Sequence, residues 1–373
     1  MCTSNAIRVL HVCGNMNIGG LENRIMDIYR NIDRDKVQFD FLLNSNNNDY
    51  NDEISSLGGR VYFIPHLSIR TVFTYKKNVK SFLNEHKEYR IIHGHAANGS
   101  FILHMVAKKQ GIPVRIAHAR SAGFGRGIKG AIKKLLCYPL RFSVTHKLAV
   151  SKLAGQSRFG KHDMKKGNVK VIPNGIDTKH FKYDETIRNH TREKLGLGNS
   201  LVIGHVGEFN YAKNHEYLID IFYEVYHQNQ NSILVLVGIG NAQNYIKEKV
   251  KKLGLSDSVK FLGKRSDVHE LLQAIDVFVF PSRYEGLPGT VIEAQATGMR
   301  CLISNKISDE IKITDLVEFL PIEENAKIWA DKVIEYSKND FKRTSRDTEL
   351  YEKGYDAHIQ AKRMEEFYLS FYN

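Results

Sequence analysis

One stretch of the sequence combines glycines, hydroxyls and carboxylates in an order suited to holding a phosphorylated ligand. Residues 281–294 read Pro-Ser-Arg-Tyr-Glu-Gly-Leu-Pro-Gly-Thr-Val-Ile-Glu-Ala and follow the strongly apolar run Val277–Phe280. Gly286 and Gly289 allow the backbone to approach a ligand closely. Gly289 is also expected to open a helix, whose free N–H groups and positive dipole end attract an anion.

Two glutamates complete this candidate ligand site. Glu285 lies in the expected loop beside Leu287, whereas Glu293 follows Thr290 in the first turns of the expected helix. The two carboxylates can therefore grip different hydroxyl-bearing parts of one ligand whose phosphate lies between them. A capped helix with two solvated glutamates is the alternative, and it accounts for two isolated glutamates better than for the whole string.

Each half of the chain begins with a buried strand, a glycine-containing loop and a helix. In the first half Gly19 and Gly20 follow the expected strand Ile7–Val12, and in the second half Gly207 follows Leu201–Val206. Lys213 ends the second loop, just before the next helix. Ligands of doubly wound sheets bind beyond the carboxyl ends of the strands, so two such edges facing each other would form an inter-domain cleft.

The elements that must position these loops alternate between strands and helices, the pattern of βαβ units around parallel sheets. The expected strands of the first half are Ile7–Val12, Val37–Leu43, Arg60–Ile64, Ile91–His93, Val114–His118 and Val169–Ile172. Those of the second half are Leu201–Val206, Ser232–Val237, Val259–Leu262, Val277–Phe280 and Cys301–Ile303. The sequence thus predicts an α/β protein with two Rossmann-like domains, 1–185 and 186–354, followed by a helical stretch within 355–373.

Length and composition exclude several other classes of protein. The chain has 373 residues, of which 42% are hydrophobic and 25% charged, enough apolar mass for two cores. Its four cysteines never approach Cys-x-x-Cys spacing, so we expect neither a disulfide framework nor a zinc site. No apolar run is long enough to span a membrane, and no export signal is expected at the start.

The net charge of +13 is concentrated in the first half. Residues 1–185 hold 30 Lys and Arg against 14 Asp and Glu, and the run 89–162 holds no acidic residue. The first half should therefore meet an anionic partner, which could be nucleic acid, a phosphate-bearing substrate or an acidic membrane surface. The basic run lacks a nucleic-acid reading motif and interleaved stacking aromatics, which argues against the first of these.

An amphipathic basic helix is expected at Gly127–Leu136, inside this acid-free run. Its apolar residues recur at helical spacing: Ile128, Ala131, Ile132, Leu135 and Leu136. Its basic residues Lys129, Lys133 and Lys134 project elsewhere, and Arg120, Arg126 and Arg141 flank it. The apolar stripe either packs on a core or docks on an anionic membrane that holds a lipid-linked acceptor.

The segment 281–294 resembles the E-x7-E motif of retaining glycosyltransferases of the family-4 type, which have the GT-B fold. The resemblance extends to 18–22, 172–177 and 207–215, and is strongest to bacterial capsule or exopolysaccharide transferases. It implies two facing Rossmann-like domains, with the last helix crossing back onto the first. It also implies metal-independent transfer of a sugar from a nucleotide donor, such as a UDP-sugar, to a lipid-linked or growing saccharide. The expected location is the cytoplasm, peripherally on the inner face of the cell membrane.

The same resemblance assigns roles to individual residues. Glu285 would contact hydroxyls of the donor sugar, Glu293 those of the ribose, and Lys213 the diphosphate. His118 matches a family histidine close to the donor sugar, although a packed histidine at a strand end is the alternative. Gly19 and Gly20 would bring backbone amides near the same phosphate or near the acceptor.

Two positions bear on activity and on metals. The family usually has an arginine after Gly207, but this chain has Glu208, and a carboxylate beside a diphosphate repels it by a few kcal/mol unless it turns away. The alternative function is therefore an inactive nucleotide-sugar-binding partner subunit. His93-Gly94-His95 has no further metal-binding context and is interpreted as a strand end without metal.

Overall fold

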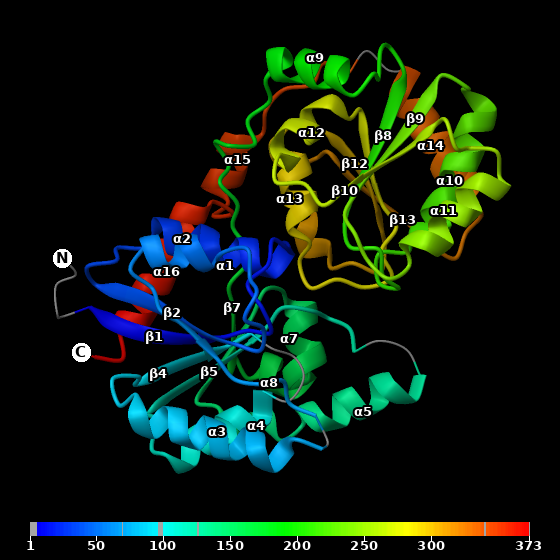
Figure 1. The fold of residues 1–373 in the computed structure, drawn as a ribbon. Helices are drawn as coiled ribbons and strands as arrows, with labels where there is room; N and C mark the ends of the chain where they lie inside the picture. Colours follow the sequence, from blue (N-terminus) through cyan, green and yellow to red (C-terminus); the bar gives the residue numbers. More distant parts are fainter. Residues whose placement is uncertain (1–5, 69, 96–99, 125–126, 339–340, 373) are drawn as a thin grey trace. The chain divides into compact units, whose positions relative to one another are not determined.

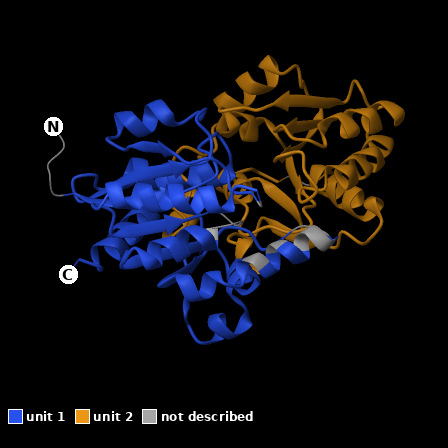
Figure 2. Cartoon of the chain, turned by 60° about the horizontal axis from the view of Figure 1, so that its bottom comes forward, with its two compact units in different colours: residues 1–175, 357–373 blue, residues 176–356 orange. Residues whose placement is uncertain are grey.

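The computed structural model describes residues 6–372 except 69, 96–99, 125–126 and 339–340 (Figure 1). The side chains of 100, 128–130, 133 and 136 also lie outside this description. The chain divides into two compact units, Met1–Gly175 with Ala357–Asn373 and Ile176–Asp356 (Figure 2).

The first unit ends at Gly175, before the residue 185 expected from the sequence. The segment that follows Gly175 is bonded to the end of the second unit. Ile176 N donates to the Tyr355 carbonyl at 2.9 Å, and the Thr178 hydroxyl donates to the buried Asp356 carboxylate at 2.7 Å. These contacts place residues 176–185 in unit 2 and return the chain to unit 1 at Ala357.

Unit 1 contains a parallel sheet of seven strands in the order β3-β2-β1-β4-β5-β6-β7. The strands are β1 Ile7–Val12, β2 Val37–Leu43, β3 Val61–Phe63, β4 Ile91–Gly94, β5 Val114–Ala119, β6 His146–Ala149 and β7 Val169–Val171. The helices are α1 Gly20–Asn31, α2 Asn51–Ser56, α3 Val72–Glu85, α4 Ser100–Lys109, α5 Gly127–Cys137, α6 Leu140–Ser143, α7 Lys152–Phe159, α8 Lys161–Lys165 and α16 Ala357–Leu369.

Unit 2 contains a parallel sheet of six strands in the order β10-β9-β8-β11-β12-β13. The strands are β8 Leu201–Val206, β9 Ser232–Val237, β10 Val259–Gly263, β11 Val277–Phe280, β12 Arg300–Ser304 and β13 Val317–Leu320. The helices are α9 Glu185–Lys194, α10 His215–Gln228, α11 Gln243–Lys252, α12 Val268–Ala274, α13 Gly289–Ala296, α14 Ala326–Lys338 and α15 Asp347–Glu352, with a 3-10 turn at Asp309–Ile311.

The strand order of each sheet reverses direction at one point, between β1 and β4 in unit 1 and between β8 and β11 in unit 2. The loops that leave these strands diverge to opposite faces of the sheet, which opens a crevice beyond their carboxyl ends where ligands of doubly wound folds bind. The candidate loops of the sequence, after β1, β8 and β11, all leave from these two points.

The last helix, α16, packs beside α1 against the sheet of unit 1 (Figure 1). Its buried side chains Ala361, Met364 and Tyr368 join the core formed by Ile25 and Phe39. The end of the chain therefore completes the core of the unit in which the chain begins. Among the described residues, no helix has both the length and the apolar character needed to cross a membrane.

Candidate functional site

The loops after β8 and β11 meet through an ion pair between Lys213 and Glu285. Lys213 Nζ lies 2.7 Å from Glu285 Oε1, and each side chain is 17% exposed. The ammonium also lies 4.6 Å from the centre of the Phe280 ring, at the end of β11. Gly207 leaves room for the Lys213 side chain, because a Cβ at position 207 would lie only 3.0 Å from Lys213 Cε.

Backbone and side-chain hydrogen bonds fix the loop that carries Lys213. Asn210 Oδ1 accepts hydrogen bonds from the backbone N–H groups of Ala212 and Lys213, at 2.9 and 3.2 Å. Arg283 N donates to the Ala212 carbonyl at 2.7 Å, and Asn214 Nδ2 donates to the Pro281 carbonyl at 3.0 Å. These bonds join the two loops directly, so the ammonium of Lys213 is held in place before any ligand arrives.

The first turn of α13 adjoins this pair. Gly289 opens the helix, and Gly286 and Leu287 are buried in the loop before it. The Thr290 hydroxyl is buried and has no hydrogen-bond partner in the described part of the chain, whereas the Glu293 side chain is buried in the next turn. A free hydroxyl, helix-end N–H groups and a fixed ammonium together offer an anion several donors.

Glu208 lies in the same loop but does not pair with Lys213. Its side chain is exposed, and its carboxylate accepts a hydrogen bond from Asn210 Nδ2 at 3.0 Å. The carboxylate that neutralises Lys213 is therefore Glu285. Glu208 instead supports Asn210, the residue that orders the Lys213 backbone.

In unit 1, Gly19 and Gly20 lie where α1 begins, beyond the end of β1. Asn23 N donates to the Gly19 carbonyl at 2.9 Å, and Gly19 N donates to Asn23 Oδ1 at 3.2 Å. The Gly19 N–H is therefore already engaged within its own helix turn. A Cβ on Gly20 would meet nothing within 4 Å, so the surface beside it is open.

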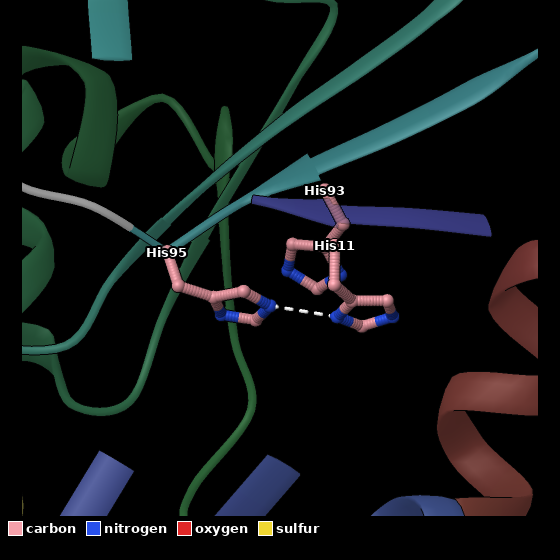
Figure 3. Close-up of side chains that lie close together, drawn as sticks. All are labelled: His11, His93 and His95. Carbon is pink, nitrogen blue, oxygen red and sulfur yellow. Dashed lines mark hydrogen bonds between the residues drawn. The ribbon is translucent and has the colours of Figure 1, made fainter. Parts of the chain in front are cut away.

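Four histidines that the sequence analysis did not group lie on one face of the unit 1 sheet. His11 and His93 are register partners on β1 and β4. His95 follows two residues after His93, and His118 lies on β5, two residues after Ile116, which is the register partner of His93. Figure 3 shows the rings of His11, His93 and His95 gathered at the carboxyl ends of these strands. In the sequence, the available signal for this cluster was a histidine near the end of each of three buried strands. That signal predicts a cluster only once the order of the strands in the sheet is known.

Hydrogen bonds connect these histidines and Arg120. His11 Nδ1 lies 2.9 Å from His95 Nε2, and Arg120 Nη2 lies 3.3 Å from His95 Nδ1. Burial lowers the pKa of His11 to about 3 and lowers those of His93, His95 and His118 well below their usual value. All four imidazoles are therefore neutral at pH 7.

His11, His93 and His95 also bring potential metal-ligating nitrogens within 4.8 Å of one another. Neutral imidazoles suit a transition metal. However, the Arg120 guanidinium occupies the His95 Nδ1 position, and a cation beside a dication is repelled by several kcal/mol at an effective dielectric near 20. These contacts favour a hydrogen-bonded cluster over a metal centre.

The residues expected to face a membrane or acceptor separate into two groups. Arg120 is tied into unit 1, because its guanidinium also donates to Asn174 Oδ1 at 3.0 Å. On α5, Ile132 and Leu135 are 50% and 72% exposed, and the Lys134 side chain is exposed as well. For these two side chains, the alternative in which the apolar stripe packs on a core is therefore wrong. Arg126 and the side chains of Lys129 and Lys133 lie outside the described residues.

Comparison with known proteins identifies the family. Residues 187–356 match the family described as "Glycosyl transferases group 1", and residues 18–180 match "Glycosyltransferase Family 4". The Bacillus subtilis protein EpsF is 34% identical over 88% of this chain and 88% of its own length. The chain belongs to the group 1, family-4 glycosyltransferases.

Further relatives agree with this assignment. CapH, the capsular polysaccharide biosynthesis glycosyltransferase of Staphylococcus aureus, is 24% identical over 98% of this chain and 99% of its own. The solved structure of Anabaena HepE superimposes with a TM-score of 0.80 at 19% identity, covering 98% of this chain and 100% of that one. This glycosyltransferase therefore has the GT-B fold. The expectations of an enzyme, of its family and of its fold are confirmed.

Proposed function

We propose that this glycosyltransferase transfers a sugar from a UDP-sugar with retention of configuration and without a metal ion. The observation that carries the proposal is the Lys213–Glu285 pair beside the first turn of α13. A leaving nucleoside diphosphate gains negative charge in the transition state, and a preorganised cation with helix-end donors stabilises that charge. Protein groups then supply the positive potential that a metal ion supplies in other transferases.

Unit 2 binds the donor in this proposal. Lys213 holds the diphosphate, Glu285 holds hydroxyls of the sugar, and the buried Glu293 holds the ribose. The choice of UDP is supported by Anabaena HepE, whose structures contain UDP, UDP-glucose, or UDP with glucose. The retaining outcome rests on the E-x7-E pattern of Glu285 and Glu293.

Unit 1 meets a lipid-linked or growing saccharide at the cytoplasmic face of the membrane. Helix α5 supports this assignment, because it carries the exposed Ile132 and Leu135 together with the exposed Lys134. Tyr138 and Phe142 are also exposed, just after this helix, and Arg141 stacks on the Tyr138 ring at 4.2 Å. An Escherichia coli relative is named as a galactosyltransferase acting on a diphosphoundecaprenol-linked sugar, which is a lipid-linked acceptor of this kind.

Calorimetric titration of UDP in the presence of EDTA tests the donor site. We expect binding without metal, weaker binding in Glu293→Ala, and unchanged binding in Lys249→Gln. Lys249 on α11 is a matched control, because it is also a lysine of unit 2 that forms an ion pair. Its Nζ lies 2.6 Å from the Asp220 carboxylate on α10. NMR of the product of transfer from a UDP-sugar should show the donor's anomeric configuration.

Two outcomes would overturn parts of this proposal. Loss of transfer on adding EDTA would refute the metal-independent mechanism. UDP binding without any transfer to lipid-linked saccharides would instead identify the alternative function, an inactive nucleotide-sugar-binding partner subunit.

A further inference from the structure

His118 ends a chain of three buried polar side chains that starts on the last helix of the protein. The Tyr368 hydroxyl on α16 lies 2.6 Å from His93 Nδ1, and His93 Nε2 lies 3.1 Å from His118 Nδ1. His118 Nε2, at the far end, is buried and has no hydrogen-bond partner among the residues that the structure describes. The His93 and His118 rings are stacked, with an interplanar angle of 8°.

The direction of this chain follows from the donors and acceptors at its start. Burial raises the pKa of Tyr368 well above its usual value, so its hydroxyl keeps its proton. Within the described part of the chain, His93 is the hydrogen-bond partner of that hydroxyl. If His93 donated to Tyr368, the phenolic proton would be buried without an acceptor, which is unfavourable. The favoured arrangement therefore has Tyr368 donating to His93 Nδ1.

The proton positions of the two imidazoles then follow. A neutral His93 that accepts at Nδ1 carries its proton on Nε2 and donates it to His118 Nδ1. A neutral His118 that accepts at Nδ1 carries its own proton on Nε2. His118 thus presents an N–H group, and the partner of that group must be an acceptor, such as a hydroxyl or a phosphoryl oxygen.

Arg120 begins a second chain of hydrogen bonds, which is separate from the first. A guanidinium donates only, so His95 Nδ1 accepts from Arg120, and His95 Nε2 donates to His11 Nδ1. Figure 3 shows the dashed contact between His95 and His11 that belongs to this second chain. No hydrogen bond joins the two chains among the described residues, so Tyr368 and His93 alone determine the proton on His118.

We propose that Tyr368 is a positioning residue that, through His93, fixes His118 as the tautomer with its proton on Nε2. This inference rests on the proposed function and on the family resemblance, which implies that His118 lies close to the donor sugar. A neutral N–H donor of fixed direction can bind a sugar hydroxyl or a phosphoryl oxygen and cannot remove a proton. The C-terminal helix thereby takes part in setting the hydrogen-bonding character of the site.

Nitrogen-15 NMR of histidine side chains in the full chain tests the proposal without any ligand. The spectrum of the unaltered protein should show His118 protonated on Nε2 and unprotonated on Nδ1. Tyr368→Phe removes only the hydroxyl, so His93 and His118 should become mixtures of both tautomers. Tyr75→Phe is the matched control, because Tyr75 is a buried tyrosine of the same unit, and its spectrum should be unchanged.

A second variant guards against a folding defect in Tyr368→Phe. His93→Gln keeps a side chain that can accept from Tyr368 and donate to His118, and we expect it to preserve the Nε2 tautomer of His118. An unaltered tautomer of His118 in Tyr368→Phe, or a proton on Nδ1 of His118 in the unaltered protein, would overturn the proposal.

Transfer rates separate this proposal from the proposed function. We expect kcat to fall about tenfold in Tyr368→Phe, the scale of one lost hydrogen bond, with unchanged UDP affinity. His93→Gln should keep the rate of the unaltered protein. A tautomer change in Tyr368→Phe supports the positioning role whatever the rate does. If the tautomer changes while kcat stays constant, the role of His118 at the donor sugar is refuted instead.

Discussion

Lys213 and Glu285 form a 2.7 Å ion pair that bridges the two loops at the switch point of the unit 2 sheet. Because both side chains are largely buried, the pair holds the ammonium at one position and with one carboxylate partner. A diphosphate that binds here meets a cation already desolvated and oriented, which reduces the ordering cost of binding. In the proposed function, the same carboxylate also binds hydroxyls of the donor sugar.

Replacing each member of this pair with the uncharged glutamine should change UDP affinity in different ways. Lys213→Gln removes a charged hydrogen-bond donor to phosphate, so we expect UDP binding to weaken by about 1.5–3 kcal/mol. Glu285→Gln removes a competing anion, so we expect UDP to bind at least as tightly while transfer is lost. Titration of UDP and a transfer assay on both variants check this, with Lys249→Gln as the control. Equal loss of UDP affinity in both variants would contradict the assigned roles.

Much of the sheet architecture could be predicted from the sequence. The boundaries of β1, β2, β8, β9 and β11 agree with the expected strands, because each is rich in large apolar residues and is mostly buried. The strands β6 and β13 were missed. Both are four residues long and contain polar residues, as in His146-Lys147-Leu148-Ala149, so hydrophobicity alone does not distinguish them from loops.

The candidate site shows more clearly which contacts the sequence alone cannot predict. The expected helix start and loop glycines near Glu285 depend on local sequence, and the structure places them together with Lys213. The histidine chain depends on contacts between β4, β5 and α16, and His93 and Tyr368 are 275 positions apart in the sequence. Such a contact follows from sheet order and from the return of the last helix, which local spacing does not encode.

Glu208 allows a test of how its negative charge affects the donor site. Glu208→Gln keeps an acceptor for Asn210 and removes the charge, so we expect UDP to bind more tightly by up to about 1 kcal/mol, since exposed charges are strongly screened. Glu208→Arg adds a cation but loses the acceptor, and we expect tighter binding by roughly 1–3 kcal/mol. Titration of UDP into both variants measures this. Unchanged or weaker affinity in both would mean that Glu208 does not oppose the phosphates.

The exposed apolar residues of α5 should contribute to membrane binding. Leu135→Asp replaces an apolar side chain with a negative charge, and we expect affinity for phosphatidylglycerol vesicles to fall by roughly 10- to 100-fold, the scale of one unburied leucine. Ile328→Asp is the matched control, because Ile328 is an exposed apolar residue on a helix of unit 2.

Replacement of the basic residues of α5 tests the electrostatic part of the same interaction. We expect the triple substitution of Lys129, Lys133 and Lys134 by Glu to release the protein from these vesicles while UDP binding persists. Binding to neutral phosphatidylcholine vesicles should be weak throughout, and binding to anionic vesicles should fall as salt rises. Co-sedimentation that is the same for Leu135→Asp, the triple variant and the unaltered protein would rule out docking through α5.

The burial of His104 should make the free energy of unfolding of unit 1 depend on pH. This side chain of α4 is fully buried, and neither ring nitrogen has a hydrogen-bond partner in the described part of the chain. Burial lowers its pKa to about 3, whereas an unfolded histidine has a pKa near 6.5. Above pH 6.5 both states are neutral, and below it only the unfolded state gains a proton. The stabilisation is therefore lost as the pH falls from about 6.5 towards 3.

The loss attributable to His104 amounts to about 2 kcal/mol between pH 7 and pH 5, which follows from the difference between the folded and unfolded pKa values. His104→Leu removes this titration, so unit 1 of the variant should lose about 2 kcal/mol less over that range. Hydrogen-exchange mass spectrometry of peptides from β4 and α4, corrected for the intrinsic pH dependence of exchange, measures the change. The exposed His66→Leu serves as the control and should follow the unaltered protein. If His104→Leu has the same pH dependence as His66→Leu, then His104 is not the neutral buried group that its surroundings indicate.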